Sequence, residues 1–338
     1  MSRATQPTDL AHATPVDTGN STPAAPPSKA RMGITCLLLT LACWSTVPLF
    51  LRDLASEVDH WSNNGWRYGV SALIWLPALV LAWRRGRLPL RIWRDALIPS
   101  LFNIAGQAAF TAAFHEMNPG LVTFGLRTQL IWVAIGAYAF VPSERSIILS
   151  PRYLIGGAIL LGGLFPVLLG GDASLGGFNP WGTTLSIFCA FCYGMYGLGV
   201  RRCMASYHPV TAFAAICQIT AIGLIGLMLL FGDAGGSGVP DLPGTALLQL
   251  FISAIIGIAL GHILYYISIA RIGIVITSGV LQLQPFFVGI ASAFIYGERF
   301  AWWQWTSGSI AVIGAFLMLT CTGPGARQVG LASSEGSD

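Results

Sequence analysis

The side chains of this chain that could do chemistry are polar groups set inside long apolar segments. Arg127 lies about seven residues into the apolar run that begins near residue 120, which is about 10 Å along a helix at 1.5 Å per residue. If that run crosses a membrane, a guanidinium facing lipid at this depth costs about 2.5 kcal/mol or more. Its forked donors suit a carboxylate or a phosphate. Arg127 is therefore a candidate for binding a negative group. The alternative is that it extends to the membrane surface and pairs with Glu116.

Two groups of amides lie in other apolar segments. Asn103 and Gln107 are four residues apart and share one helix face, which Thr111 continues. We expect this face to line a cavity, with hydrogen bonding between helices as the alternative. Gln282 and Gln284 would lie about 200° apart on an ideal helix, so only one of them can face such a cavity. Gln282 is nearest the middle of its segment and is the one we favour.

Aromatic and titratable side chains complete the candidate site. His262 is the group within an apolar segment that titrates near neutral pH, so it is a candidate for proton coupling, and a buried structural histidine is the alternative. Trp44 and Tyr193 fall on equivalent positions when residues 32–51 are aligned with residues 180–200 at an offset of 149. They are predicted to form aromatic walls of a pathway or to pack between helices.

The sequence offers no arrangement for catalysis. It contains no HExxH motif, no pair of carboxylates within an apolar segment and no Walker A motif, and no Ser-His-Asp set can be assembled. Cys189 and Cys192 form a CxxC, but they have no second pair or nearby acid, which favours packing over metal or redox chemistry. We therefore predict no enzymatic activity, no metal and no cofactor. A membrane enzyme acting on lipid-linked substrates is the disfavoured alternative.

The elements that must position these side chains are membrane helices. The chain is 54% hydrophobic and only 9% charged, whereas a soluble domain has about 25% charged residues. A helix needs about 20 apolar residues to span a bilayer. Ten segments qualify: roughly 32–51, 63–83, 96–115, 120–140, 152–170, 180–200, 209–231, 245–269, 273–295 and 302–321. The prediction is an all-α integral membrane protein with polar tails at residues 1–31, expected to be disordered, and 322–338.

The basic residues predict the orientation of these helices. With the amino terminus inside, all of the 18 lysines and arginines except Arg52, Arg67, Arg127 and Arg299 fall in inner segments. This excess predicts that both termini are cytoplasmic. The net charge of +4 therefore reflects membrane topology and does not indicate nucleic-acid binding. Arg67, early in its segment, is expected to lie at the interface.

The chain contains an internal repeat. At an offset of 154 residues, Glu144 and Arg145 fall on Glu298 and Arg299. The same offset aligns Thr123 with Thr277, Gly125 with Gly279, Ala137 with Ala291, Ala139 with Ala293 and Phe140 with Phe294. The repeats are predicted at residues 32–170 and 178–321, each with five helices. Because five is odd, the repeats should be inverted relative to each other, with a substrate site between them near mid-membrane.

The five-plus-five arrangement, the paired Glu-Arg boundary and the glycine-spaced helices after it resemble the drug/metabolite transporter superfamily, in particular its EamA-like branch. Val141-Pro142-Ser143 lengthens the first boundary loop and departs from the family pattern. The resemblance implies a transporter in the plasma membrane (the bacterial inner membrane) that moves amino acids, other metabolites or drugs, commonly outward and often with protons.

These observations lead to a hypothesis and its alternatives. We expect a secondary transporter, an exporter of small polar metabolites such as amino acids, with the bilayer, its substrate and protons as partners. In this hypothesis Arg127 binds a negative group, Gln107, Asn103 and Gln282 form hydrogen bonds, and Trp44 and Tyr193 form walls. An exporter of hydrophobic drugs is the close alternative. Glu144 and Glu298 are expected to fix helix ends or loops.

Overall fold

The computed structural model describes residues 27–116, 122, 125–169, 180–296 and 302–321. Within these ranges the regular structure is helical throughout, as the apolar composition predicts. The helix α1 begins at Pro27, inside the segment expected to be a polar tail. Residues 1–26 and 322–338, where most of the two predicted tails fall, lie outside the described part.

The first half of the chain is α1 (Pro27–Leu54), α2 (His60–Arg84), α3 (Arg91–Glu116), α5 (Gln129–Phe140), η1 (Pro142–Glu144), α6 (Arg145–Ile148) and α7 (Pro151–Leu169). The second half is α8 (Pro180–Cys203), α9 (Pro209–Phe231), η2 (Asp233–Gly236), η3 (Val239–Asp241), α10 (Gly244–Ser253), the π-helix η4 (Ala254–Leu260), α11 (Gly261–Ile272), α12 (Ile274–Leu281), α13 (Gln284–Tyr296) and α14 (Trp302–Leu319). Most of the predicted apolar segments thus coincide with helices or with helices in series, whereas the segment 120–140 contains the shorter helix α5 and lies partly outside the described residues.

Seven of the described helical segments are long and apolar enough to cross a membrane, and an eighth qualifies if a pair bent by 67° counts as one span. That pair is Pro142–Ile148 with Pro151–Gly163, and two shorter apolar helices are Gln129–Phe140 and Trp305–Leu319. Large apolar side chains such as Leu73 and Ile222 are 70% and 73% exposed, as expected of surfaces that face lipid. The protein is therefore a multi-pass membrane protein, and ten complete spans stay a prediction.

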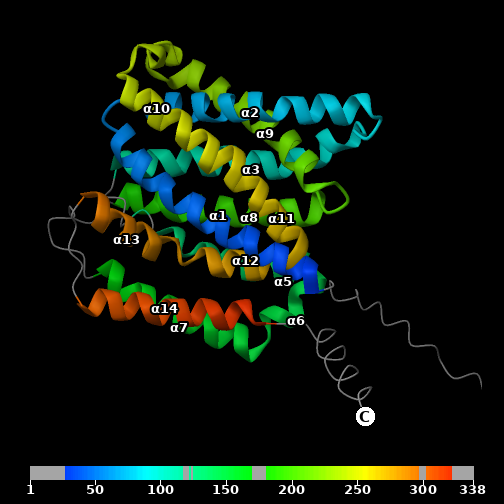
Figure 1. Cartoon of the computed structure of the whole chain (residues 1–338), viewed down its shortest axis with the longest axis vertical. Coiled ribbons are helices and arrows are strands. Elements are labelled where there is room, and N and C mark those ends of the chain that lie inside the picture. The colour runs from blue at the N-terminus through cyan, green and yellow to red at the C-terminus, as the bar shows by residue number, and fades with distance from the viewer. Residues whose placement is uncertain (1–26, 117–121, 123–124, 170–179, 297–301, 322–338) are drawn as a thin grey trace, which may run out of the picture.

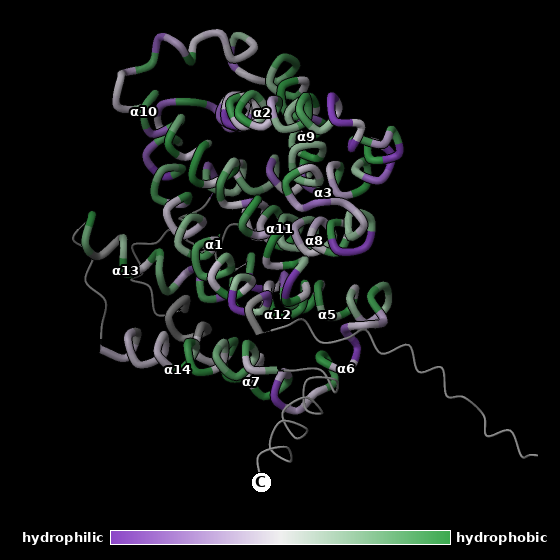
Figure 2. The backbone as a smooth tube through the Cα atoms, turned by 45° about the vertical axis from the view of Figure 1, so that its right-hand side comes forward, coloured by the Kyte–Doolittle hydropathy of each residue, from purple (hydrophilic) through white to green (hydrophobic). Residues whose placement is uncertain are grey.

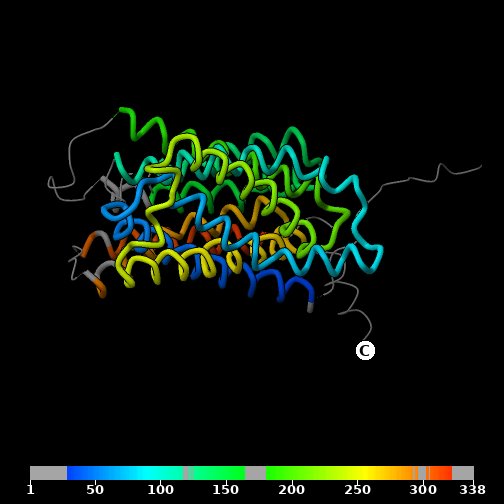
Figure 3. Tube along the Cα trace, turned by 90° about the horizontal axis from the view of Figure 1, so that it is seen from above, coloured from blue at the N-terminus to red at the C-terminus, as the bar shows by residue number. Residues whose placement is uncertain are grey.

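The helices lie along a broadly common direction and pack in pairs far apart in sequence (Figures 1 and 3). In Figure 1, α2 packs on α9 at one end of the long axis, and α7 packs on α14 at the other. Between them α3 packs on α8, and α1 packs on α11. Exchanging the two halves converts the α3–α8 pair into the α11–α1 pair and maps α2–α9 and α7–α14 onto themselves. The packing therefore follows the internal repeat.

Hydrophilic residues gather at the ends of the helices. Figure 2 shows them at the turn after α2 and around α6, whereas hydrophobic residues cover most of the helices. The helix α1 begins and α14 ends at the same end of the bundle (Figure 1). Local signals set several helix ends: the Asp59 carboxylate accepts the backbone N–H groups of Trp61 and Ser62 at 2.9 Å each, which caps α2. Pro209 starts α9, where its missing N–H costs nothing.

Glu144 joins the two halves at one end of the bundle. Its carboxylate is 3% exposed and accepts the backbone N–H groups of Ile274 at 3.2 Å and Val275 at 2.8 Å, in the first turn of α12. Arg201, at the end of α8, donates Nε–H to the same carboxylate at 2.9 Å. A carboxylate at a helix N-terminus is stabilised by the helix dipole and by the free N–H groups. These bonds confirm that Glu144 fixes a helix end, and Glu298 lies outside the described residues.

We expect Glu144→Gln to lower the free energy of unfolding by about 3 kcal/mol, because Arg201 would keep a half-buried charge without its anion. Arg91→Gln is the matched control: Arg91 pairs with Asp95 at 3.2 Å on an exposed helix face and is 80% exposed. That exposed pair should contribute about 0.5 kcal/mol or less. Thermal unfolding in detergent measures both variants, and equal losses would contradict this view of Glu144.

Glycines let α7 and α14 approach closely. A Cβ at Gly163 would lie 2.6 Å from the backbone nitrogen of Ala311 and 2.7 Å from the carbonyl oxygen of Ser307. A Cβ at Gly156 would lie 2.8 Å from the carbonyl oxygen of Gly314. These neighbours are backbone atoms of α14, which cannot move aside as a flexible side chain can. Small residues at such contacts are typical of helix pairs in membranes.

Two adjacent glycines give a controlled test of this contact. Gly163→Ala should lower the free energy of unfolding by about 1–3 kcal/mol, because the added methyl overpacks the interface. Gly162→Ala should leave it unchanged or raise it, since a Cβ at Gly162 meets nothing within 4 Å and alanine favours helix. Thermal unfolding of the two variants under one set of conditions decides the matter. Equal stability of both would show that α7 and α14 are not in close contact there.

Candidate functional site

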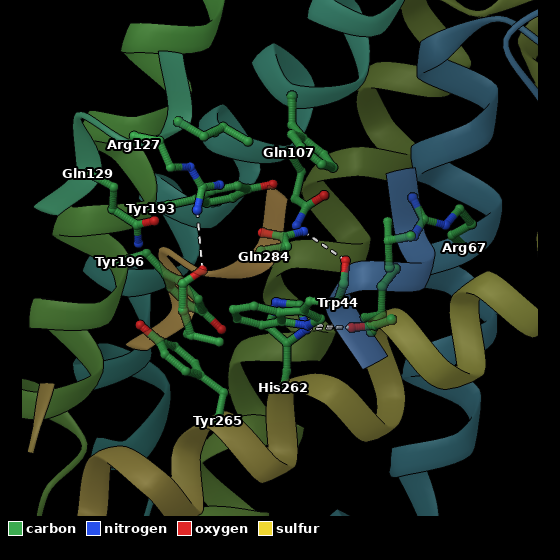
Figure 4. Close-up of a pocket in the computed structure, with 16 residues that line it drawn as sticks. Trp44, Arg67, Gln107, Arg127, Gln129, Tyr193, Tyr196, His262, Tyr265 and Gln284 are labelled. Carbon is green, nitrogen blue, oxygen red and sulfur yellow. Dashed lines mark hydrogen bonds between the residues drawn. The ribbon is translucent and has the colours of Figure 1, made fainter. Parts of the chain in front are cut away.

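Both halves of the chain line a cavity of about 80 Å³, here called the central cavity (Figure 4). Such a volume holds only a few water molecules. The first half contributes residues from α1, α2, α3, the turn before α5 and the first residue of α5. The second half contributes residues from α8, η4, α11, α12 and α13. Its polar lining consists of Trp44, Arg67, Gln107, Arg127, Gln129, Tyr193, Tyr196, His262, Tyr265 and Gln284.

Arg127 lines the central cavity from the turn that precedes α5. The side chain is directed inward and is 6% exposed. Its Nη1 donates to the carbonyl oxygen of Leu281 at 3.2 Å, a bond drawn in Figure 4. Leu281 is the last residue of α12, where helix carbonyls lose their partners within the helix. The arginine of one half therefore contacts the helix break of the other.

Helix α3 places its two candidate amides differently. Gln107 lines the central cavity and is 7% exposed. Asn103 is fully buried and lies outside the cavity lining: its Nδ2 donates to the Tyr68 hydroxyl at 3.1 Å and the Thr220 hydroxyl at 3.3 Å. Asn103 thus joins α3 to α2 and α9. Hydrogen bonding between helices was the alternative to a cavity lining for this face of α3. Thr111 accepts from Asn64 at 2.7 Å, which ties the other end of the face to α2.

Gln284, and not Gln282, lines the central cavity. The segment 273–295 is not one continuous helix: α12 ends at Leu281 and α13 begins at Gln284, so angles on an ideal helix do not apply across the break. Gln282 is 1% exposed and its Nε2 donates to the Ser278 carbonyl at 3.0 Å. Gln284 donates to the Trp44 carbonyl at 2.7 Å. Pro285, at the second position of α13, is compatible with the start of a new helix.

Aromatic rings form much of the cavity wall. Trp44 and Tyr193 both line it, one from each half. The Trp44 ring lies 5.0 Å from the Tyr265 ring and 5.1 Å from the His262 ring. Tyr196, also in the lining, donates or accepts a hydrogen bond with Tyr266 at 2.9 Å. Hydroxyl and indole groups add hydrogen-bonding capacity to an otherwise apolar surface.

His262 lies in the cavity wall among aromatic rings. It is 5% exposed, and its ring lies within 6.5 Å of the rings of Trp44, Tyr68, Tyr196 and Phe213. Its Nδ1 is 3.2 Å from the carbonyl oxygen of Gly257. A carbonyl oxygen only accepts, so Nδ1 carries the proton and Nε2 is the basic nitrogen.

The π-helix η4 was not predicted from the sequence. In η4 the Gly257 carbonyl oxygen also accepts the Trp44 Nε1–H at 2.9 Å, so a side chain of α1 bonds to the backbone of the second half. Trp75 Nε1 donates to the Ala259 carbonyl at 3.0 Å in the same way. Single π turns within α-helices occur frequently at functional sites. Hydropathy carries no signal for them, because the residues are as apolar as those of an α-helix.

Arg67 is the functional candidate that sequence reasoning missed. It was expected at the interface, but α2 begins at His60, and Arg67 lies two turns inside it, 2% exposed and in the cavity lining. Its Nε and Nη1 have no hydrogen-bond partner among the described residues. The predicted segment began at residue 63, which put Arg67 only four residues from its edge, so the sequence contained no signal of this depth.

The described residues offer no group of three His, Cys, Asp or Glu side chains that could hold a metal ion. Cys189 and Cys192 are 0% and 1% exposed on α8, and Cys189 belongs to an apolar cluster with Phe110 and Ala190. Of the residues that line the central cavity, none is acidic. The lining therefore combines arginine, amide and aromatic groups, which bind solutes by charge and hydrogen bonds.

Comparisons with known proteins agree with this arrangement. The chain is 27% identical over 146 residues to "Triose phosphate/phosphate translocator, chloroplastic" of Solanum tuberosum, a match that covers 43% of this chain and 34% of the translocator. A solved structure titled "Crystal structure of protein" has the same fold, with a TM-score of 0.68 and 20% identity over 93% of this chain and 100% of that one. The model of the EamA-like transporter family matches residues 31–169 and 180–320, which are the two repeats. The chain belongs to the EamA-like transporter family, a group within the drug/metabolite transporter superfamily.

Proposed function

We propose that this protein is a secondary transporter that moves a small polar metabolite across the cytoplasmic membrane of a bacterium by alternating access, with the central cavity as its substrate site. The observation that carries the proposal is one polar cavity lined by both repeats. Transporters built from inverted repeats bind substrate between the repeats, often where helices are interrupted. The breaks at η4 and between α12 and α13 adjoin this cavity, which supports the assignment.

The proposed architecture is ten spans in two inverted repeats of five. The exchange of helix pairs between the halves supports it, as does the location of the start of α1 and the end of α14 at one end of the bundle. The basic residues at that end, such as Arg84, Arg145 and Arg201, favour a cytoplasmic location for both termini. In such a protein, an exchange of conformations between the two repeats turns an inward-open cavity into an outward-open one.

Glu144 is proposed to act in this cycle as a cytoplasmic latch. It joins the loop after α5 to the start of α12 and to the end of α8, so both repeats are held together at that end. An inward-open state requires these elements to separate. The carboxylate must then exchange two backbone N–H donors and a guanidinium for water, which gives the closed state a defined free-energy advantage.

Within the cavity, we assign binding of a negative group on the substrate to Arg127. Gln107 and Gln284 supply hydrogen bonds, and Trp44 and Tyr193 enclose the substrate. Gln284 takes the role that the sequence had suggested for Gln282, and Asn103 is assigned to helix packing. Export of a small polar metabolite is the proposed direction and class, with a hydrophobic-drug exporter as the competing function.

Arg127→Gln separates the two functions. In proteoliposomes holding the full chain, the variant should lower transport of metabolites with a carboxylate or phosphate about 30-fold or more, which corresponds to about 2 kcal/mol for a buried charged contact. Transport of neutral hydrophobic drugs, which have no negative group for Arg127 to bind, should be the same in this variant as in the unmodified protein. Arg84→Gln, which removes an exposed arginine at the end of α2, is the control. If the Arg127 variant transports charged metabolites normally, Arg127 is not the anion contact.

His262 is proposed as the proton-coupling group, with Nε2 as the nitrogen that takes the proton. His262→Gln can still donate a hydrogen bond to Gly257 but cannot carry a charge. We expect the variant to exchange labelled for unlabelled substrate across the membrane, because exchange needs no net proton movement. Accumulation driven by a pH gradient should be lost. Accumulation that persists in the variant would exclude His262 from coupling.

A further inference from the structure

We infer that the central cavity selects a compact dianion, such as a phosphate, a phosphate monoester or a dicarboxylate, and that Arg67 is its second cationic contact beside Arg127. This inference rests on the proposed transport function and narrows its substrate class. It is carried by two nitrogens of the Arg67 guanidinium, Nε and Nη1, that have no hydrogen-bond partner among the described residues, and by the charges of the residues that line the cavity.

Arg67 is a buried cation that forms no ion pair with any of the described acidic residues. Its side chain is 2% exposed, and neither Nε nor Nη1 has a hydrogen-bond partner in the described part of the chain. An arginine in a protein stays protonated, so the charge cannot be avoided by losing a proton. Buried charges are paired or bind a ligand, because an unpaired one is strongly unfavourable. Arg67 also lines the central cavity, which is the space where a ligand can meet it.

The position of Arg67 favours a ligand contact over a structural one. Its Nη2 lies near Gly257, where an added Cβ would come within 3.4 Å of it. Gly257 is the residue of η4 whose carbonyl bonds to Trp44, at the cavity wall. A Cβ at Gly257 would also lie 2.6 Å from the Val47 side chain, so the guanidinium lies where α1 and η4 pack closely at the cavity wall. Figure 4 shows Arg67 and Arg127 on different sides of the cavity, with Trp44, Gln107 and Gln284 between them.

The charge of the lining argues for a dianion over a zwitterion. Among the described residues, two arginines and no acidic residue line the cavity. An amino acid brings an ammonium group, and this lining offers no carboxylate to receive it. Its positive charge would add to those of Arg67 and Arg127 in a space with little water, where like charges repel strongly. A dianion instead meets a forked donor on either side, the geometry that suits phosphate and carboxylate oxygens.

The remaining polar groups of the lining suit the neutral part of such a solute. Gln107, Gln129 and Gln284 have amide groups that can donate to and accept from hydroxyls, and Tyr196 and Tyr265 add phenolic hydroxyls. The relative from Solanum tuberosum carries the name of a triose phosphate/phosphate translocator, which is consistent with this chemistry.

The test measures binding and transport separately on the full chain. Binding is measured as the rise in melting temperature when inorganic phosphate, glycerol 3-phosphate or succinate is added to the detergent-purified protein. Chloride and alanine at equal ionic strength are the controls. Bound ligand stabilises the folded state by mass action. Transport is the uptake of labelled phosphate, glycerol 3-phosphate, succinate or alanine into proteoliposomes loaded with the same unlabelled compound. We expect at least one dianion to raise the melting temperature more than alanine does. The same dianion should be exchanged across the membrane faster than alanine.

Variants assign the effect to Arg67. Arg67→Gln should raise the half-saturating concentration of the dianion about 30-fold or more. Arg67→Lys should retain part of the affinity, because it keeps the charge but loses the fork. Arg84→Gln, on the same helix, should match the unmodified protein. If Arg67→Gln fails to fold, Gln284→Glu serves instead: it leaves both arginines and adds a carboxylate to the wall, and it should weaken dianion binding to a similar extent.

The outcomes distinguish this inference from the proposed function. Exchange of alanine in preference to every dianion, with no change in Arg67→Gln, overturns the dianion assignment and leaves the transporter proposal intact. If the protein transports none of the compounds but is stabilised by a dianion in an Arg67-dependent way, the site assignment stands and the transport proposal fails. The absence of any shift in melting temperature and of any exchange with all three dianions overturns the inference.

Discussion

The cost of placing a charge inside an apolar helical bundle is the constraint on which the rest of this structure depends. In the described part of the chain this cost applies to three ionised side chains that are between 2% and 6% exposed: Arg67, Arg127 and Glu144. Glu144 is satisfied by two backbone N–H groups and by Arg201, so it holds elements together. Arg67 lines a cavity, and its Nε and Nη1 have no hydrogen-bond partner within the described ranges. The need to stabilise a buried charge thus accounts for a structural contact at Glu144 and for a candidate binding site at Arg67.

The cost of burying polar groups also applies to the backbone where the helices are interrupted. In the apolar region, backbone groups must find partners within the protein. Where α12 ends, the Leu281 carbonyl accepts from Arg127, and in η4 the Gly257 carbonyl accepts from Trp44. Each interruption therefore exposes a backbone acceptor to a side chain of the other half. These contacts place the lining of the central cavity on the boundary between the repeats, where a relative movement of the halves would alter its shape.

Much of the fold could be predicted from hydropathy and self-similarity. The helix α9 was expected at residues 209–231 and spans Pro209–Phe231, and the predicted repeats coincide with the two matches to the family. Two of the misses arise because backbone hydrogen bonding decides where a helix begins or ends, and a third arises because side chains far apart in the sequence meet. The break between α12 and α13 moved Gln284 to the cavity and left Gln282 outside it. The helix α2 begins earlier than predicted, which places Arg67 in the interior. Asn103 bonds to side chains of α2 and α9, and no local sequence pattern reveals these partners.

The pairing of α2 with α9 and of α7 with α14 has a consequence for how such a chain can be assembled. In each pair an element contacts its own counterpart, while α3–α8 and α1–α11 are one contact made twice. Each half therefore meets the other through the same set of helix positions, although the residues at those positions differ between the halves. The covalent link between the halves keeps these two sets of contact surfaces close together and in a fixed one-to-one ratio.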